Sequence, residues 1–198
     1  LRGLAGSAKA ALGIKDDPDF ASLVETPRTI FNANVTPQRR VATQATSLAR
    51  MKAIGEAAGG SINDVLLAAC SGAIRRYLLE LDKLPKKALI ASVPVALARD
   101  ASEAGGNAIS FANVKLGTDI ADVRERFELI SRSSVAGRTY LKQMSHTALI
   151  DYTVLISSPQ MLTRVPGIGA RVPPIYNVII SNVPGPRTAL YVGRAELE

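Results

Sequence analysis

The stretch GGSINDVLLAACSGAIRR, residues 59–76, places two polar residues, Asn63 and Asp64, directly before an apolar run. Ser61 stands three residues before Asp64, which is the spacing of a capping box: the serine hydroxyl accepts the main-chain N–H of residue 64, and the carboxylate accepts that of Ser61. The carboxylate also lies favourably at the positive end of the helix dipole. We therefore predict a helix over residues 62–81, with Asn63 free to point away from it.

Two glycines before Ser61 separate this helix from another one. Glycine adopts the left-handed conformation that ends a helix at little cost, so Gly59-Gly60 is a stop signal. Upstream of it, residues 44–58 repeat apolar side chains at helical spacing and are predicted to form a helix. Its expected inner face consists of Leu48, Met51, Ile54 and Ala58.

Downstream, two β-rich segments, residues 88–97 and 108–116, flank a polar loop that contains glycine, which favours an antiparallel pair. Two more helices are expected, one beginning at Asp119 and one over residues 145–162. The inner face of the first should carry Val123, Phe127 and Ile130. A strong buried strand follows at 175–183, and another begins at 189. The predicted fold class is α/β (α+β): a mixed, mostly antiparallel sheet with packed helices.

The composition limits the kinds of protein this can be. Of the 198 residues, 47% are apolar and 21% charged, which excludes a disordered chain. The net charge of +7 comes from small clusters, among them Arg75-Arg76 and Arg124 with Arg126. No basic cluster is long or interleaved with aromatic residues, so nucleic acid is not an expected partner. No apolar run approaches the length of a membrane span.

A second polar group interrupts the apolar strand near the carboxyl end of the chain. The sequence Ser181-Asn182-Val183-Pro184-Gly185-Pro186 places small hydrogen-bonding side chains where a strand ends and prolines force a turn. A strand end of this kind is a common position for a site, because the sheet holds it rigid. A turn whose asparagine satisfies local backbone groups explains the same residues equally well.

No complete catalytic apparatus is visible in the sequence. His146 is the only histidine and has no partner pattern around it, so a structural or surface role is expected. Cys70, the only cysteine, is expected to be a small core residue; it excludes an internal disulfide and fits a reducing, cytoplasmic setting. Metal-ligand spacing, a phosphate-binding loop and a serine triad are all missing. We expect part of an enzyme, or a binding module.

Several segments together resemble one known family. GGSINDVLLAACSGAIRRYLLE is similar to the Asn-Asp motif region of the bacterial wax ester synthase/diacylglycerol acyltransferases, and ISNVPGP to their later strand-turn motif. The segments LIASVPVAL and GGNAISFANVKLGTDIADVRERF fall between them in the family's order. The resemblance covers most of residues 25–198.

The resemblance implies the C-terminal half of an enzyme with two chloramphenicol-acetyltransferase-like domains. The family's active-site motif, HHxxxDG, belongs to the N-terminal half and does not occur here. Residues 1–24 would be a linker from that missing domain, and residues 25–198 a C-terminal acyltransferase domain that stops before the family's usual end. By position, Asn63, Asp64, Ser181, Asn182 and Gly185 would shape the site or bind substrate.

The implied activity moves a long-chain acyl group from acyl-CoA to a fatty alcohol or diacylglycerol. Acyl-CoA is a substrate, and no metal or other cofactor is expected. The implied partners are the N-terminal half and a membrane or lipid-droplet surface, so the protein would be cytoplasmic and peripherally associated with lipid. Two alternatives remain open: a non-catalytic module that binds lipid or a partner, and a condensation-type acyltransferase whose donor is a carrier protein.

Overall fold

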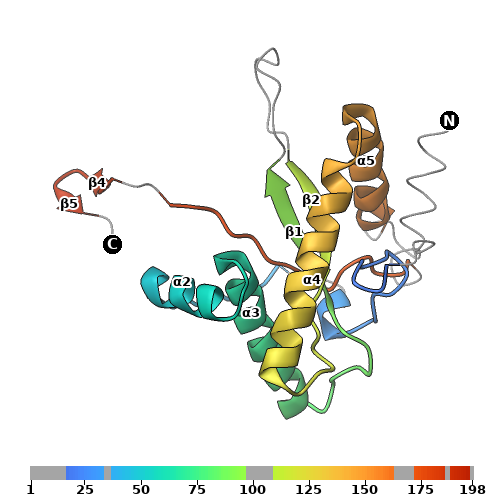
Figure 1. The fold of residues 1–198 in the computed structure, drawn as a ribbon, viewed down its shortest axis with the longest axis horizontal. Helices are drawn as coiled ribbons and strands as arrows, with labels where there is room; N and C mark the ends of the chain where they lie inside the picture. Colours follow the sequence, from blue (N-terminus) through green and yellow to red (C-terminus); the bar gives the residue numbers. More distant parts are fainter. Residues whose placement is uncertain (1–16, 34–36, 97–108, 163–171, 186–187, 197–198) are drawn as a thin grey trace.

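The computed structural model describes residues 17–33, 37–96, 109–162, 172–185 and 188–196 (Figure 1). Most of the predicted linker, residues 1–16, and Pro186 of the strand-turn motif lie outside this part. The elements, in chain order, are η1 (Ile30–Asn32), α2 (Leu48–Ala57), α3 (Ile62–Glu80), β1 (Ile90–Ala96), β2 (Ile109–Lys115), α4 (Val123–Lys142), α5 (His146–Leu162), β3 (Val178–Ile179), β4 (Tyr191–Val192) and β5 (Ala195–Glu196).

A three-stranded mixed sheet in the order β2-β1-β3 lies at the centre. The strands β1 and β2 are antiparallel over their full length, from Ile90 opposite Lys115 to Ala96 opposite Ile109. The strand β3 pairs with β1 in parallel, with Ala91 opposite Val178. The predicted antiparallel pair and the predicted class, a mixed sheet with packed helices, are both confirmed.

The strand β3 is shorter than the sequence predicts and is not uniformly buried, since Ile179 is 55% exposed. Alternate N–H groups along a strand point to the same side. Ile90 directs its N–H toward β3, so residue 94 would direct its own to the same side. Residue 94 is proline and has no N–H to donate. The ladder with β3 therefore ends after Ile180, whose N–H donates to the Ser92 carbonyl at 3.1 Å.

Helices pack against the sheet and against each other (Figure 1). The helix α4 lies along β2, and a methyl group at Gly137 would lie only 3.2 Å from the Ala112 side chain. One core cluster joins α3, β1, β2 and α4. It consists of Leu67, Leu78, Leu89, Ala91, Val93, Val114, Leu116 and Ile130. A second joins residue 20 to β2, α4 and α5, and consists of Phe20, Ala112, Tyr140, Leu141, Tyr152 and Ile156.

A tight corner joins α2 to α3, whose axes meet at 97°. Gly59 has a φ of +70°, and the Gly60 N–H donates to the Gly55 carbonyl at 2.8 Å. Together with the bond from the Gly59 N–H to the Glu56 carbonyl, this is a Schellman motif. The predicted helix stop at the two glycines is confirmed. The next helix begins at once, with Ser61 as its N-cap.

Two predicted helix faces differ from the structure. The helix predicted to begin at Asp119 begins at Val123, because the Asp122 carboxylate accepts the Glu125 N–H at 2.8 Å and acts as the cap. Val123, predicted to face inward, is 68% exposed, whereas Phe127 and Ile130 are buried as predicted. In α2, the predicted inner face is largely exposed, and Gly55 is the buried residue.

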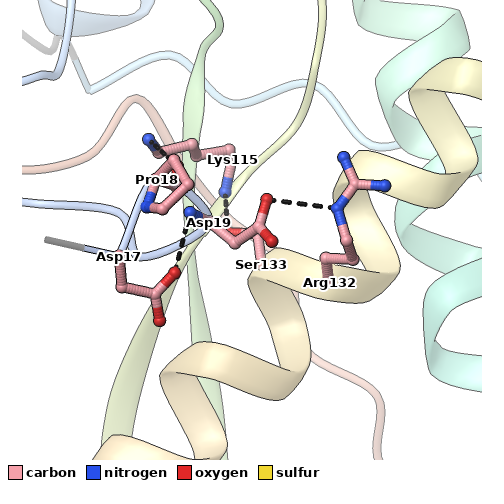
Figure 2. Close-up of polar contacts among 6 residues, drawn as sticks. All are labelled: Asp17, Pro18, Asp19, Lys115, Arg132 and Ser133. Carbon is pink, nitrogen blue, oxygen red and sulfur yellow. Dashed lines mark hydrogen bonds and ion pairs between the residues drawn. The ribbon is translucent and has the colours of Figure 1, made fainter.

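Residues 17–25, here called the strap, lie across β2 and α4 (Figure 2). The Lys115 ammonium group donates to the Pro18 carbonyl at 2.8 Å and pairs with the Glu25 carboxylate at 3.0 Å. Arg132 of α4 pairs with Asp19 at 3.2 Å. Phe20 of the strap is buried in the second core cluster. The domain boundary at residue 25 remains a prediction.

After β3 the chain leaves the body of the molecule and carries the β4–β5 hairpin away from it (Figure 1). Several large apolar side chains in this arm are exposed, including Val183 at 78% and Val192 at 66%. Among the described residues, no single helix meets the length and hydropathy needed to cross a membrane. The bent pair α2 and α3 meets them only when the two helices are taken together.

Candidate functional site

The start of α3 is a complete capping box. The Asp64 Oδ2 atom accepts the Ser61 main-chain N–H at 2.8 Å and the Ser61 hydroxyl at 2.7 Å. The Asp64 N–H donates to the Ser61 Oγ at 3.3 Å. The Asp64 side chain is only 2% exposed, and within the described residues its Oδ1 atom has no hydrogen-bond partner. The predicted structural role of Asp64 is confirmed.

Asn63 lies beside this cap and is half-buried. Within the described ranges, its side chain makes no hydrogen bond, in contrast to Asp64. The hydrogen bonds of the α3 cap thus come from Ser61 and Asp64, and the Asn63 amide is not needed for them. A functional role for Asn63 remains a prediction.

Ser181, Asn182 and Gly185 are all exposed and follow β3. Among the described residues, apart from the chain neighbours of Gly185, no atom lies within 4 Å of the position that a Cβ would take there. In the described part of the chain, no hydrogen bond joins these residues to Asn63. The structure places the two predicted groups on different elements, the start of α3 and the end of β3.

The residue that sequence reasoning missed is Asn177. It is 6% exposed, and its Oδ1 atom accepts the Ile90 N–H at 2.9 Å. Its Nδ2 atom donates to the Pro27 carbonyl at 2.7 Å and to the Asn32 Oδ1 at 2.8 Å. One side chain therefore connects β1, the entry to β3 and a segment 150 residues earlier. An asparagine within the apolar run IYNVIISNV was the available signal, since a buried amide requires partners.

The partner segment is itself well ordered around η1. Thr29 caps this short helix, and the Asn32 Oδ1 accepts the Thr29 N–H at 3.2 Å. The Asn32 Nδ2 donates to the Tyr176 carbonyl at 3.0 Å. The Arg28 guanidinium donates to the Val172 carbonyl at 2.7 Å. Residues 27–32 thus hold the chain on both sides of Tyr176 before it enters β3.

Two of the positively charged side chains make hydrogen bonds that stabilise the fold. Arg126 is 6% exposed and donates to the Ile120 carbonyl at 2.8 Å, and Arg75 donates to the Thr118 carbonyl at 2.5 Å. Both guanidinium groups therefore bind carbonyls of the loop that joins β2 to α4. Arg126, which forms a basic cluster with Arg124 in the sequence, is therefore buried and not available to a soluble anion.

The structure gives little indication that His146 or Cys70 is a catalytic residue. His146 is the first residue of α5. Cys70 is half-buried instead of fully buried, and burial raises the pKa of its thiol, which disfavours the reactive thiolate. Within the described ranges no group of three potential metal ligands occurs. An open groove of about 490 Å³ beside the strap contains none of the predicted site residues.

Two family models match this chain, one toward each end. Residues 1–66 match the wax ester synthase/diacylglycerol acyltransferase catalytic domain, and residues 105–198 match the WS/DGAT C-terminal domain. A putative diacylglycerol O-acyltransferase of Mycobacterium bovis is 40% identical over 173 residues, which are 87% of this chain and 38% of that protein. The O-acyltransferase WSD of Acinetobacter baylyi is 36% identical over 182 residues, covering 92% of this chain and 39% of that one.

A solved structure agrees with these matches. The wax ester synthase/diacylglycerol acyltransferase of Marinobacter aquaeolei superposes with a TM-score of 0.73 at 32% identity, over 98% of this chain and 43% of that one. The fold is that of part of this wax ester synthase/diacylglycerol acyltransferase. The chain belongs to the wax ester synthase/diacylglycerol acyltransferase family. It spans about two fifths of the length of these relatives.

Proposed function

We propose that this chain is the C-terminal part of an O-acyltransferase that moves a long-chain acyl group from acyl-CoA to a fatty alcohol or diacylglycerol. The products are wax ester or triacylglycerol, and free CoA leaves. The observation that carries the proposal is the similarity over 98% of the chain to a wax ester synthase/diacylglycerol acyltransferase of known structure. The two family models, in the same order along the chain, support it.

The chemistry requires a general base, an acceptor hydroxyl and a thioester. A histidine outside residues 1–198, in an HHxxxDG motif, removes the hydroxyl proton, and the oxygen attacks the thioester carbonyl. The tetrahedral oxyanion collapses, the C–S bond breaks, and the thiolate takes up the proton. Donors that are in place before the reaction stabilise the oxyanion. The reaction needs no metal or prosthetic group.

This chain supplies one wall of the site. Asn63 is the candidate donor or substrate contact at the start of α3, because its amide makes no hydrogen bond to the residues that the structure describes. Ser181 and Asn182, with Gly185, form the second candidate group, and Asp64 holds the helix start on which Asn63 stands. The partner is the N-terminal part of the enzyme, which approaches these groups. The lipid substrates place the enzyme at a membrane or lipid-inclusion surface, facing the cytoplasm.

The test is an assay of the full-length enzyme that contains this chain, with palmitoyl-CoA and either hexadecanol or diacylglycerol as acceptor. We expect wax ester or triacylglycerol to form, and residues 1–198 alone to form neither. The control is the full-length enzyme with alanine at the second histidine of HHxxxDG, which should lose turnover but still bind acyl-CoA.

Three results would contradict the proposal. Ester formation by residues 1–198 alone would place the base within them. Transfer from an acyl carrier protein but not from palmitoyl-CoA would identify a condensation-type enzyme. Lipid binding by the full-length protein without any ester product would identify a binding module.

A further inference from the structure

We propose that Asn177 is a positioning residue, which with Asn32 and Thr29 fixes the strand end that carries Ser181 and Asn182. The proposal rests on the proposed function insofar as that strand end is part of the acyl-transfer site. The physical part, that this cluster holds β3 in place, stands on the contacts alone.

The cluster connects three segments that are distant in sequence. The Asn177 N–H donates to the Ile90 carbonyl at 2.8 Å, and the Ile90 N–H donates back to the Asn177 Oδ1 at 2.9 Å. The Asn177 Nδ2 donates to Pro27 and Asn32, with the Thr29 hydroxyl at 3.4 Å. The Asn177 side chain thus adds a hydrogen bond between β1 and the segment before β3 that main-chain pairing alone does not provide.

The strand β3 has two other kinds of anchor: the Ile180 N–H donates to the Ser92 carbonyl at 3.1 Å, and Val178 and Ile180 pack against the first core cluster. Its regular pairing with β1 covers only Val178 and Ile179, and Pro94 prevents the ladder from continuing toward Ser181. Residues 181–185, which follow Ile180, are exposed. Residues 178–180 connect Asn177 to Ser181, so the bonds of Asn177 act together with the contacts of Val178 and Ile180 to set the position of Ser181.

The direction of each hydrogen bond is fixed by the partners. The Asn177 amide nitrogen faces a carbonyl and the Asn32 oxygen, which are both acceptors, and its oxygen faces an N–H. Aspartate at this position keeps the shape and the acceptor for Ile90. It loses both donors and sets a buried carboxylate oxygen against two other oxygens. Asn177→Asp therefore removes the bonds from residue 177 to Pro27 and Asn32 while changing the volume very little, and it leaves the bond from Asn32 to the Tyr176 carbonyl in place.

The first measurement is hydrogen exchange of the full-length enzyme, which does not depend on activity. In Asn177→Asp we expect the amides of residues 178–181 to exchange about tenfold faster or more, because the segment opens locally. The matched control is Ser71→Ala, which removes a buried hydrogen bond to the Leu116 carbonyl at a site remote from β3 in sequence. It should lower the melting temperature without selective exchange at 178–181.

The second measurement is steady-state kinetics of the same variants with palmitoyl-CoA and hexadecanol. Asn177→Asp should lower kcat on the order of tenfold to a hundredfold with little change in KM for acyl-CoA, because a misplaced group costs rate more than binding. Thr29→Val, which removes the weakest contact of Asn177 together with the bonds of the Thr29 hydroxyl to Phe31 and Asn32, should show the same pattern in milder form and remains informative if Asn177→Asp does not fold.

Unchanged exchange at 178–181 in Asn177→Asp would overturn the proposal. Faster exchange with unchanged kcat would overturn the link to catalysis. If the wild-type enzyme forms no ester at all, the proposed function fails, and the exchange measurement still decides whether the cluster holds β3.

Discussion

Gly60 and Phe127 lie in such close contact that a methyl group on residue 60 would come within 2.6 Å of the Phe127 Cζ atom. The same methyl group would lie 3.4 Å from the Asp64 Oδ2 atom. The aromatic ring of α4 therefore covers the corner between α2 and α3, and glycine is required there for space. This contact fixes the first turn of α3, where Asn63 and Asp64 stand, against α4.

We expect Gly60→Ala to destabilise the protein by about 1–3 kcal/mol, because the buried ring must move to admit the methyl group. Thermal unfolding measures this loss. The control is Gly72→Ala in the interior of α3, where the nearest side-chain atom to the new methyl group lies at 3.6 Å. This change should be neutral or stabilising by up to about 1 kcal/mol. Equal melting temperatures for Gly60→Ala and wild type would show that the ring moves aside freely.

Asp64 and Asn63 should respond differently to alanine. Asp64→Ala removes the acceptor for two hydrogen bonds of the cap and should lower the free energy of unfolding by about 1–2 kcal/mol. Asn63→Ala should leave stability within about 0.5 kcal/mol, since the described structure shows no bond from its amide. In the full-length enzyme, Asn63→Ala should lower turnover. Preserved turnover in Asn63→Ala would remove this residue from the proposed site.

Lys115 should be the main polar attachment of the strap. Its side chain is 16% exposed and binds both a carbonyl and a carboxylate. We expect Lys115→Ala to make residues 17–25 more sensitive to limited proteolysis and to cost about 1–3 kcal/mol. Arg132→Ala removes an ion pair whose arginine is 55% exposed and should cost less than about 1 kcal/mol. A larger effect at Arg132 than at Lys115 would contradict this ranking.

Burial of Tyr152 predicts a fall of stability at alkaline pH. Desolvation raises the pKa of Tyr152 far above the ordinary value of 10.0, and its neighbour Tyr140 raises it further. The folded state therefore holds the phenolic proton more tightly than the unfolded state. Its contribution is fully present below pH 10.0 and is lost as the pH rises from there toward the folded-state pKa. Melting temperatures measured on both sides of pH 10.0 should fall more steeply for wild type than for Tyr152→Phe.

Local signals predicted the structure well where the interaction partners are close in sequence. The capping box needs only Ser61 and Asp64, and the helix stop needs only Gly59 and Gly60, so both follow from the sequence. The length of β3 does not follow from its own sequence, because it depends on Pro94 in the neighbouring strand β1. The prediction that Val123 faces inward was wrong, because Asp122 and not Asp119 is the N-cap of α4.

Only part of the candidate site could be predicted from the sequence. Asp64 was placed correctly in the cap, while the roles of Asn63, Ser181, Asn182 and Gly185 remain predictions. Asn177 was missed because its partners, Pro27 and Asn32, lie about 150 residues earlier, and no local pattern indicates such a pairing. Its one visible sign was a polar side chain within an apolar run.

Within the described part of the chain, β3 has a neighbouring strand on one side only. An unpaired strand edge is a template for the addition of another strand. Any preparation of these residues on their own should therefore self-associate as concentration rises, and the size distribution in solution should shift before any loss of helix content. Charged substitutions at Ile179, whose side chain is exposed beside that edge, offer a practical way to keep the polypeptide dispersed.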